Sequence, residues 1–326
     1  MNKTTTQKIT DYISKKGQAS GKELTEFLAS ISSRAVRKQL KKLFDKKILQ
    51  KIGKPPKVFY MLSEKKHPIV TGQINPKLLE IINKRYLYIS PTGQQLEGWN
   101  GFVIWCTKTK QNPVKTAQEY MKTLNKYDRY KKHNLIDGIP KINRTFKKVF
   151  LDKLHYLDFY SIERFGKTKL GQMLLYAKQS QNKHLIGKIV NEIKSVVIKI
   201  ISNNRIDGVL FVPPTVKREI QFMKILEDML RLPVRKLSVS KIKTEIIIPQ
   251  KTLSKLEDRI ENAQKTIIVE DAYKYKNILL IDDAVGSGAT MNEIARQIRN
   301  RKLSKEKIVG LAITGSFKGF DVISEV

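Results

Sequence analysis

The chain has 326 residues, of which 40% are hydrophobic, and this length allows two or three folded domains. It contains no apolar run of about 18 residues and no apolar core of a signal peptide, so we expect neither a membrane span nor secretion. Cys106 is the single cysteine, which excludes an intramolecular disulfide and a multi-cysteine zinc site and fits the reducing cytoplasm.

The chain is strongly basic, with 63 lysine and arginine residues against 30 acids and a net charge of +33. Such an excess predicts attraction to polyanions, and to nucleic acid first. Residues 1–66 hold 17 basic and 5 acidic residues, so charge is densest there. A lysine-rich composition spread over solvated faces is the alternative, because the rest of the chain is basic as well.

Residues 1–66 are predicted to form a first domain of three helices and a β-hairpin. Helices are expected over residues 6–16 and 22–28 and from Ser33 onward, where the serine hydroxyl can cap the helix. Two strands follow, over residues 48–52 and 57–62, around the turn GKPP. In the third helix the residues expected to face inward are Val36, Leu40, Leu43 and Phe44.

The stretch SSRAVRKQLKKLFDKKILQKIGKPPKVFYML resembles winged helix-turn-helix domains, which implies that the third helix enters the major groove of DNA. The hairpin would then be the wing. Some such domains instead bind proteins, and that alternative stays open. The residues expected to contact double-stranded DNA are Ser33, Arg34, Arg37, Lys38, Lys41, Lys51, Lys54 and Lys57.

Residues 67–156 are predicted to form a small mixed α/β segment of unassigned role. The stretch YLYISPTGQQLEGWNGFVIWC predicts a small sheet with a turn at Pro91–Gly93, and TAQEYMKTLNKYDRYKKH predicts a helix. Aromatic residues among lysines can stack on bases, but packing is the expected role. His133 and His155 have no partners at the spacing of metal ligands.

Residues 157–326 alternate between helical and strand patterns, which predicts a mostly parallel sheet with helices on both faces. The expected helices cover residues 169–177, 185–201, 218–232, 252–263 and 291–298. The expected strands cover residues 207–214, 266–270, 278–281 and 307–316.

One segment of this part, ILLIDDAVGSGAT at residues 278–290, combines a buried strand, two acids and a loop of small residues before a helix. Backbone N–H groups of such a loop and the positive end of the helix form a phosphate cradle. Gly286 and Gly288 keep side chains out of it. The carboxylates of Asp282 and Asp283 suit a vicinal diol, so the segment predicts a ribose 5-phosphate site beyond the carboxyl ends of the strands.

This segment resembles the phosphoribosyl-pyrophosphate (PRPP) motif of type I phosphoribosyltransferases. VPPTVKREIQFMKIL resembles the proline loop and Gln-bearing helix of the ComF-like branch, and PQKTLSKLEDRIENA resembles its Gln, Leu, Arg and Asn pattern at Gln250, Leu253, Arg259 and Asn262. The resemblance covers residues 158–316. It implies a phosphoribosyltransferase-like fold and a ligand-borne Mg²⁺ that bridges pyrophosphate and ribose, with no metal site made by the protein alone.

The resemblance also implies roles for individual residues. Asp282 and Asp283 would hold the ribose hydroxyls at the reacting centre, the loop after them the 5-phosphate, and the proline loop the pyrophosphate. The residues so implied in PRPP binding are Asp282, Asp283, Ala284, Val285, Gly286, Ser287, Gly288, Ala289, Thr290, Pro213, Pro214, Thr215, Lys217 and Arg218.

Three departures from the family pattern bear on activity. Gly286 stands where many members have threonine, the segment before the Gln helix is reduced to REIQF, and the cysteine-rich zinc module of ComF proteins is absent. The acid pair could alternatively be a solvated strand end or a receiver-type Mg²⁺ site. The loop that holds the acceptor base is expected in residues 157–201 or 67–156.

Together these patterns predict a cytoplasmic DNA-binding regulator that responds to PRPP or a nucleoside phosphate. The alternatives are an active phosphoribosyltransferase, with the N-terminal domain used for assembly or targeting, and a ComF-like factor in DNA uptake or processing. A homodimer is an open alternative to a monomer.

Overall fold

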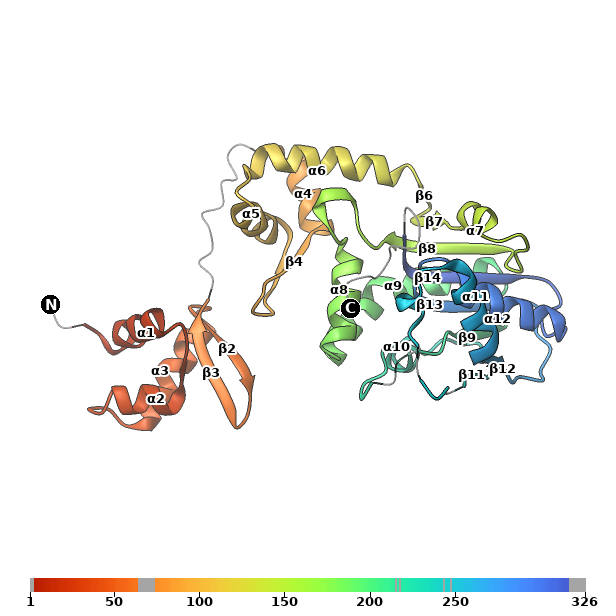
Figure 1. Ribbon diagram of the computed structural model, residues 1–326. Helices are drawn as coiled ribbons and strands as arrows, with labels where there is room; N and C mark the ends of the chain where they lie inside the picture. The colour runs from red at the N-terminus through yellow and green to blue at the C-terminus, as the bar shows by residue number, and fades with distance from the viewer. Residues whose placement is uncertain are drawn as a thin grey trace. The chain divides into compact units, whose positions relative to one another are not determined.

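The computed structural model describes residues 3–63, 74–214, 216, 218–242, 244–246 and 248–316. The chain divides into two compact units, one of residues 1–72 with 89–94 and one of residues 73–88 with 95–326. Figure 1 shows the elements of both, with the N-terminal helices in red and the last strand in blue. The division at residues 66 and 156 that the sequence suggested stays a prediction.

The N-terminal unit contains the helices and the hairpin that the sequence predicted. Within residues 3–63, strands β1, β3 and β2 form an antiparallel sheet in that order. Its core consists of buried aliphatic side chains from all three helices, such as Ile9, Leu24 and Leu40. The elements are α1 (Thr5–Lys16), β1 (Ala19–Ser20), α2 (Gly21–Phe27), α3 (Ser33–Asp45), β2 (Leu49–Lys54) and β3 (Lys57–Leu62).

Two details of helix α3 differ from the prediction. Ser32, not Ser33, is the N-cap, and its hydroxyl accepts a hydrogen bond from the N–H of Ala35. Phe44 does not face inward: 41% of its surface is exposed, and the Lys51 ammonium lies 4.9 Å from its ring. Val36, Leu40 and Leu43 already complete the buried stripe, so the next residue along the helix turns outward.

The segment after the N-terminal unit is mostly helical. The predicted sheet over residues 86–106 is right only at two short strands, because residues 98–108 form a helix. Trp99, Phe102, Val103 and Cys106 follow the helical spacing and are buried. The elements are α4 (Pro76–Arg85), β4 (Leu87–Ile89), β5 (Gln95–Glu97), α5 (Gly98–Lys108), α6 (Pro113–Asp128), β6 (Lys131–Lys132), β7 (Leu135–Asp137) and α7 (Ile139–Thr145).

The remaining residues form an α/β arrangement, as predicted, although one predicted strand belongs elsewhere. The strand expected at residues 266–270 pairs with β11 in a separate antiparallel pair. The elements are β8 (Lys153–Phe159), η1 (Glu163–Phe165), α8 (Lys169–Gln179), α9 (Lys183–Asn203), β9 (Gly208–Phe211), α10 (Phe222–Leu230), β10 (Arg235–Lys236), β11 (Val239–Lys241), η2 (Gln250–Thr252), α11 (Leu256–Thr266), β12 (Ile267–Val269), β13 (Ile278–Val285), α12 (Ala289–Asn300) and β14 (Ile308–Gly315).

The described strands of this unit form one large sheet in the order β10-β9-β13-β14-β8-β7-β6. The first five of these strands are parallel, and β7 and β6 extend the β8 edge in antiparallel fashion. Strand β8 runs across the boundary predicted at residue 156, and β6 and β7 join the same sheet. The sheet therefore draws on residues that the sequence assigned to the middle segment.

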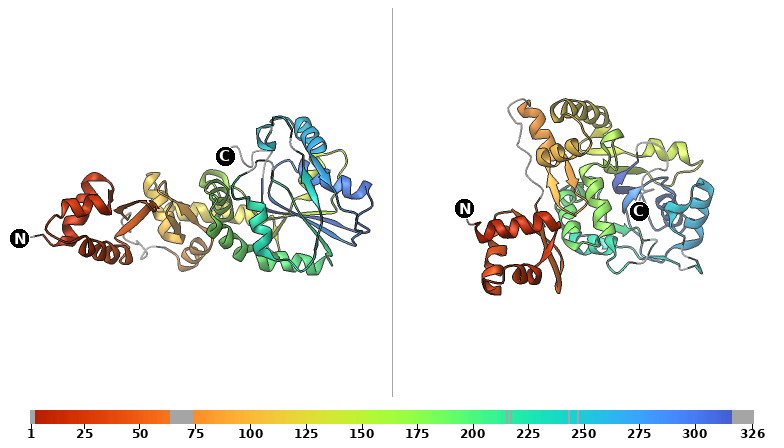
Figure 2. Two further views of the ribbon diagram at one scale, coloured as in Figure 1. Left: turned by 90° about the horizontal axis from the view of Figure 1, so that it is seen from below. Right: turned by 60° about the vertical axis from the view of Figure 1, so that its left-hand side comes forward.

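Helices cover both faces of this sheet, which Figure 2 shows from two directions. Helices α8, α9 and α10 lie on one face, where α9 contacts both of the others. Helices α11 and α12 pack together on the opposite face. Because crossovers between parallel strands are right-handed, the direction in which the chain moves along the sheet decides which face the connecting helices cover. The chain first moves from β8 to β9 and β10, and it then returns to β13 and β14, so the helices of the two halves cover opposite faces.

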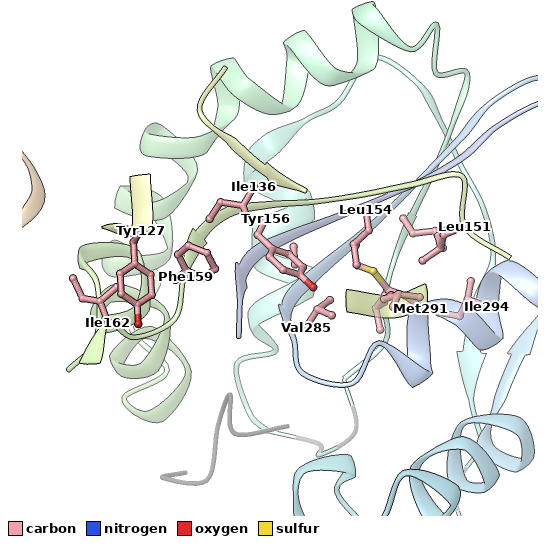
Figure 3. Packing of buried hydrophobic residues seen from close by; sticks show 14 of the residues in the cluster. Tyr127, Ile136, Leu151, Leu154, Tyr156, Phe159, Ile162, Val285, Met291 and Ile294 are labelled. Atoms are coloured by element: carbon pink, nitrogen blue, oxygen red, sulfur yellow. The ribbon is translucent and has the colours of Figure 1, made fainter. Parts of the chain in front are cut away.

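The core of the unit lies between β8, β13, β14 and the helices that cover them. In Figure 3, Leu154 and Tyr156 of β8 point toward the same layer as Val285 and Met291. Strand β13 is buried over residues 278–281, is partly accessible at residues 282–284 and is buried again at Val285. The apolar half of the strand thus anchors the sheet and carries its polar end to the edge where the loops diverge.

Candidate functional site

Strands β9 and β13 are parallel neighbours, but the chain leaves them in opposite directions. From β9 it continues to β10 at the sheet edge, and from β13 to β14 toward the other edge. Loops that diverge in this way leave a crevice at the carboxyl ends of the two strands, which is where open α/β sheets bind ligands. This topological switch point places the loop after Phe211 opposite the loop after Val285.

A cavity of about 490 Å³ opens at this switch point. Segments that are far apart in the sequence meet around it. The predicted binding residues that line it are Pro213, Pro214, Arg218, Asp282, Asp283, Ala284, Val285, Gly286, Ser287, Gly288, Ala289 and Thr290. Thr215 and Lys217, which were also predicted, lie outside the described residues.

The acid pair lies inside a strand and not after it, which corrects the predicted end of the strand at Ile281. Strand β13 continues to Val285, and Asp282 is in register with Ala312 of β14. The ladder therefore fixes the backbone at Asp282 and again at Ala284, on either side of Asp283. One Asp282 carboxylate oxygen also accepts a hydrogen bond from the N–H of Asp283 at 2.8 Å, and this bond orients the Asp282 side chain.

A lysine that the sequence did not single out compensates the charge of the acid pair. The Nζ of Lys178, at the end of α8, lies 2.7 Å from Oδ2 of Asp283. Burial and the neighbouring Asp283 carboxylate raise the pKa of Asp282 well above its ordinary value, and Lys178 opposes that rise. The site thus combines one ion-paired carboxylate with one that resists ionisation.

The loop after β13, which the sequence predicts to be a phosphate cradle, leads into the N-terminus of α12. Gly288 is the N-cap of α12, with φ +85°, a conformation that glycine adopts without strain. The buried Ser287 hydroxyl accepts the N–H of Ala289 at 3.3 Å and keeps its own proton to donate. No acid occupies the first turn of α12, so its positive end faces the loop unopposed.

The proline loop is tied to α8 through Arg218. Its Nη1 donates a hydrogen bond to the carbonyl of Lys178, while Gln221 donates to the carbonyl of Arg218 at 2.8 Å. The N–H of Ile220 donates to the side chain of Gln181 at 2.8 Å. These contacts hold two cations, Lys178 and Arg218, at the cavity beside the acid pair.

Part of the cavity wall comes from residues 249–259. Lys178 is the one described lining residue from 157–201, and none of the described lining residues comes from 67–156. Gln250 donates to the carbonyl of Arg259 at 2.9 Å and to the side chain of Asn262 at 3.2 Å. Arg259 donates to the carbonyl of Leu253 at 2.7 Å, so these residues shape the wall.

Segment 138–150 supports the cradle from behind, and sequence reasoning missed this role. Asn292 of α12 accepts the N–H of Phe150 at 2.9 Å and donates to the carbonyl of Lys148 at 3.0 Å. The ammonium of Lys141 donates to the hydroxyl of Ser316, whose N–H donates to the carbonyl of Val285 at 3.2 Å. Neither partnership has a sequence signal, because the partners are more than a hundred residues apart.

The described part of the site offers two neighbouring carboxylates to a divalent cation. Within the described residues no group of three or more His, Cys, Asp or Glu side chains could hold a metal ion. Asp282 and Asp283 offer carboxylate oxygens, and Mg²⁺ commonly combines one or two carboxylates with phosphate oxygens of its substrate. The donor set is therefore compatible with Mg²⁺ carried by a phosphorylated ligand.

The residues predicted to contact DNA lie on the surface of the N-terminal unit. Ser33, Arg34, Arg37, Lys38 and Lys41 are exposed on α3, and Val36 and Leu40 hold the helix to the core from the other side. Lys51 of β2 and Lys57 of β3 are exposed on the hairpin. Lys54 lies in β2, and its side chain is outside the described part.

Comparisons with known proteins identify no family. No family model and no curated protein matches the chain. Among solved structures, it is similar to a hypothetical protein from Neisseria gonorrhoeae with bound ppGpp, at 12% identity and TM-score 0.25, over 44% of this chain and 73% of that one. It is also similar to a hypoxanthine phosphoribosyltransferase from Staphylococcus aureus, at 16% identity and TM-score 0.25, over 44% and 83%.

Among the helices that the structure describes, none has both the length and the apolar character needed to cross a membrane.

Proposed function

We propose that the C-terminal unit binds PRPP or a related ribose phosphate. The observation that carries this proposal is the meeting of the Asp282–Asp283 pair, the Gly286–Gly288 loop and the N-terminus of α12 in one cavity at the switch point. A diol-binding acid pair beside a phosphate cradle suits a ribose 5-phosphate. The guanidinium of Arg218 at the same cavity suits further phosphate.

Each residue of the site has a defined task in this proposal. The carboxylates of Asp282 and Asp283 accept hydrogen bonds from the ribose hydroxyls, and the N–H groups of the loop hold the 5-phosphate. Arg218 and the proline loop face the pyrophosphate, and their positive charge compensates it. Mg²⁺, when it arrives with the ligand, neutralises phosphate charge and leaves the positioning to the protein.

We further propose that the N-terminal unit is a winged helix that binds double-stranded DNA and that the protein is a PRPP- or nucleotide-responsive regulator. The exposed basic face of α3 supports this, because Arg34, Arg37, Lys38 and Lys41 project from a helix whose other face is fixed in the core. In such a regulator, ligand and DNA change each other's affinity by the same factor.

An active phosphoribosyltransferase is the second candidate, and one observation favours it. The cavity is also lined by apolar side chains, Phe222, Met223, Leu253 and Ile267, which suit the flat face of an acceptor base. A ComF-like role in DNA uptake or processing, a homodimer and a cytoplasmic location belong to the same set of proposals.

Calorimetric titration of the full chain with PRPP and Mg²⁺, with and without duplex DNA, tests the proposal. We expect saturable binding of PRPP and a change in its affinity when DNA is present. Absence of PRPP binding by the folded protein contradicts the ligand assignment. Product formation from PRPP and a nucleobase, followed by chromatography, would favour the transferase over the regulator.

A further inference from the structure

Lys178 and Asp283 form an ion pair in the floor of the cavity. Lys178 lies one residue from the end of α8, and Asp283 lies in β13, 105 positions later in the chain. Their charged atoms are 2.7 Å apart, and only 25% of the Lys178 side chain and 16% of the Asp283 side chain is exposed to solvent. An ion pair this sheltered is screened less by solvent than a surface pair.

The acid pair needs a cation nearby if both carboxylates are to ionise. Two adjacent carboxylates at the end of a buried strand repel one another, and burial penalises each charge. In many phosphate sites a divalent cation supplies the compensation. Here the ammonium of Lys178 already contacts Asp283.

Two arginines at the cavity make hydrogen bonds to backbone carbonyls. The guanidinium of Arg218 donates to the carbonyl of Lys178, and Nε of Arg259 donates to the carbonyl of Leu253. Neither contact involves the acid pair. Arg218 instead fixes the end of α8, so it helps hold Lys178 in place beside Asp283.

The ion pair leaves room for a sugar. A carboxylate offers about four lone-pair positions. In the structure Asp283 uses one oxygen for Lys178, and Asp282 uses one for the N–H of Asp283. Both side chains therefore keep acceptor positions for ribose hydroxyls while the ammonium remains in place.

We propose that Lys178 is a positioning residue that supplies at Asp283 the positive charge a ribose phosphate would otherwise draw from a divalent cation, so that the site binds ribose 5-phosphate with little dependence on Mg²⁺. The inference rests on the proposed ribose phosphate site and specifies how its charge is balanced.

The test is a titration of the full chain with ribose 5-phosphate, once in EDTA and once in excess Mg²⁺. The wild-type dissociation constant should differ by less than about threefold between the two conditions. Lys178→Met should bind at least about tenfold more weakly in EDTA, and Mg²⁺ should restore most of the loss. Lys178→Arg keeps the charge and should behave as the wild type.

Lys169→Met is the matched control. Lys169 begins the same helix and pairs with Glu192 at 2.5 Å, away from the acid pair, so its loss should leave both constants unchanged. Thermal unfolding of each variant verifies folding.

The titration distinguishes a failure of the role proposed for Lys178 from a failure of the proposed ribose phosphate site. If the wild type binds but Lys178→Met binds equally well in EDTA, or Mg²⁺ does not restore its affinity, the inference is wrong and the ribose site stands. The same holds if Lys178→Arg does not bind like the wild type. If the wild type binds ribose 5-phosphate in neither condition, the proposed function is wrong and the inference falls with it.

Discussion

Gly288 of the cradle lies against Ile142 of α7: a Cβ atom built on Gly288 would lie 2.6 Å from Cδ1 of Ile142. The contact joins the loop that we assign to the 5-phosphate with a helix that precedes the parallel strands. Together with the hydrogen bonds of Asn292 to Lys148 and Phe150, it holds the first turn of α12 against segment 138–150. The cradle is thus supported from behind as well as by its own strand.

The first prediction follows from this contact. Gly288→Val adds a branched side chain where φ is +85° and Ile142 leaves no space, so the loop must shift. We expect binding of PRPP and ribose 5-phosphate to be lost, as measured by calorimetry, while the N-terminal unit stays folded.

A matched glycine separates loop geometry from a general effect of added methyl groups. Gly187 in α9 has an ordinary φ, and the nearest atom to a built Cβ is 3.8 Å away. Gly187→Ala should therefore leave binding intact and leave stability unchanged or raised by up to about 1 kcal/mol. Normal ribose 5-phosphate binding by folded Gly288→Val would show that this loop is not the cradle.

The second prediction concerns the acid pair. The double change Asp282→Asn and Asp283→Asn keeps the side-chain shapes but reduces the local negative charge and weakens the acceptors for the ribose hydroxyls. PRPP affinity should fall at least tenfold, which is about 1.4 kcal/mol. Calorimetry on the folded double variant gives the answer, and an unchanged affinity would refute the ribose assignment.

The third prediction is a dependence of stability on pH. Burial and Asp283 raise the pKa of Asp282 far above its ordinary 3.8, so between the two values the folded state holds a proton that the unfolded state has lost. The stability contributed by this residue therefore falls as pH rises from about 4 toward 8. Asp282→Asn should remove that contribution and raise the melting temperature relative to the wild type at pH 8, not at pH 4. A larger stabilisation at pH 4 would contradict the sign.

The fourth prediction concerns a buried hydroxyl. Tyr156 is 2% exposed, its ring faces Gly315, and its OH has no hydrogen-bond partner among the described residues. Burial of such a group carries a desolvation cost without a compensating bond. Tyr156→Phe should therefore leave the free energy of unfolding unchanged or raise it by up to about 1 kcal/mol, measured by urea denaturation. A loss above about 1 kcal/mol would show that the OH has a partner in the folded protein.

The local half of the site could be predicted from the sequence. Strand, acid pair, glycine loop and helix occupy one continuous stretch, and both the apolar run at 278–281 and the helical spacing after Met291 are local signals. Even there the end of the strand was misplaced, because ladder hydrogen bonds from β14 carry β13 past Asp283. The sequence thus predicts Asp282 and Asp283 to follow the strand, whereas in the fold they belong to it.

The long-range half could not be predicted. Lys178 meets Asp283 only because α8 and β13 are packed in one unit, and no spacing encodes that pairing. The place of the acceptor loop stays a prediction, and the cavity wall that residues 249–259 form has no local signal, because a wall is defined by what faces it across the fold. In residues 98–108, aromatic and β-branched side chains suggested strand, whereas burial of one helical face determined the result.

The fifth prediction concerns helix α3 and separates a DNA-binding role from a protein-binding one. Arg34, Arg37, Lys38 and Lys41 are exposed, and the helix is anchored through Val36, Leu40 and Leu43, so alanine at the four basic positions should leave the fold intact. Each lost phosphate contact should reduce the salt slope of DNA affinity by about 0.9. A residue that reads a base edge should instead cost about 1–3 kcal/mol on its own sequence only.

Mobility shifts of the full chain over a salt series measure these slopes, and Lys15→Ala, on the exposed end of α1, is the control with an equal charge change. If the single substitutions in α3 change the slope no more than Lys15→Ala does, the helix does not recognise DNA. Repeating the series with saturating PRPP and Mg²⁺ then decides between regulator and enzyme. A regulator requires that PRPP shifts DNA affinity and that DNA shifts PRPP affinity by the same factor. DNA binding that ignores PRPP would leave α3 as the DNA-binding helix and make the transferase the better account of the cavity.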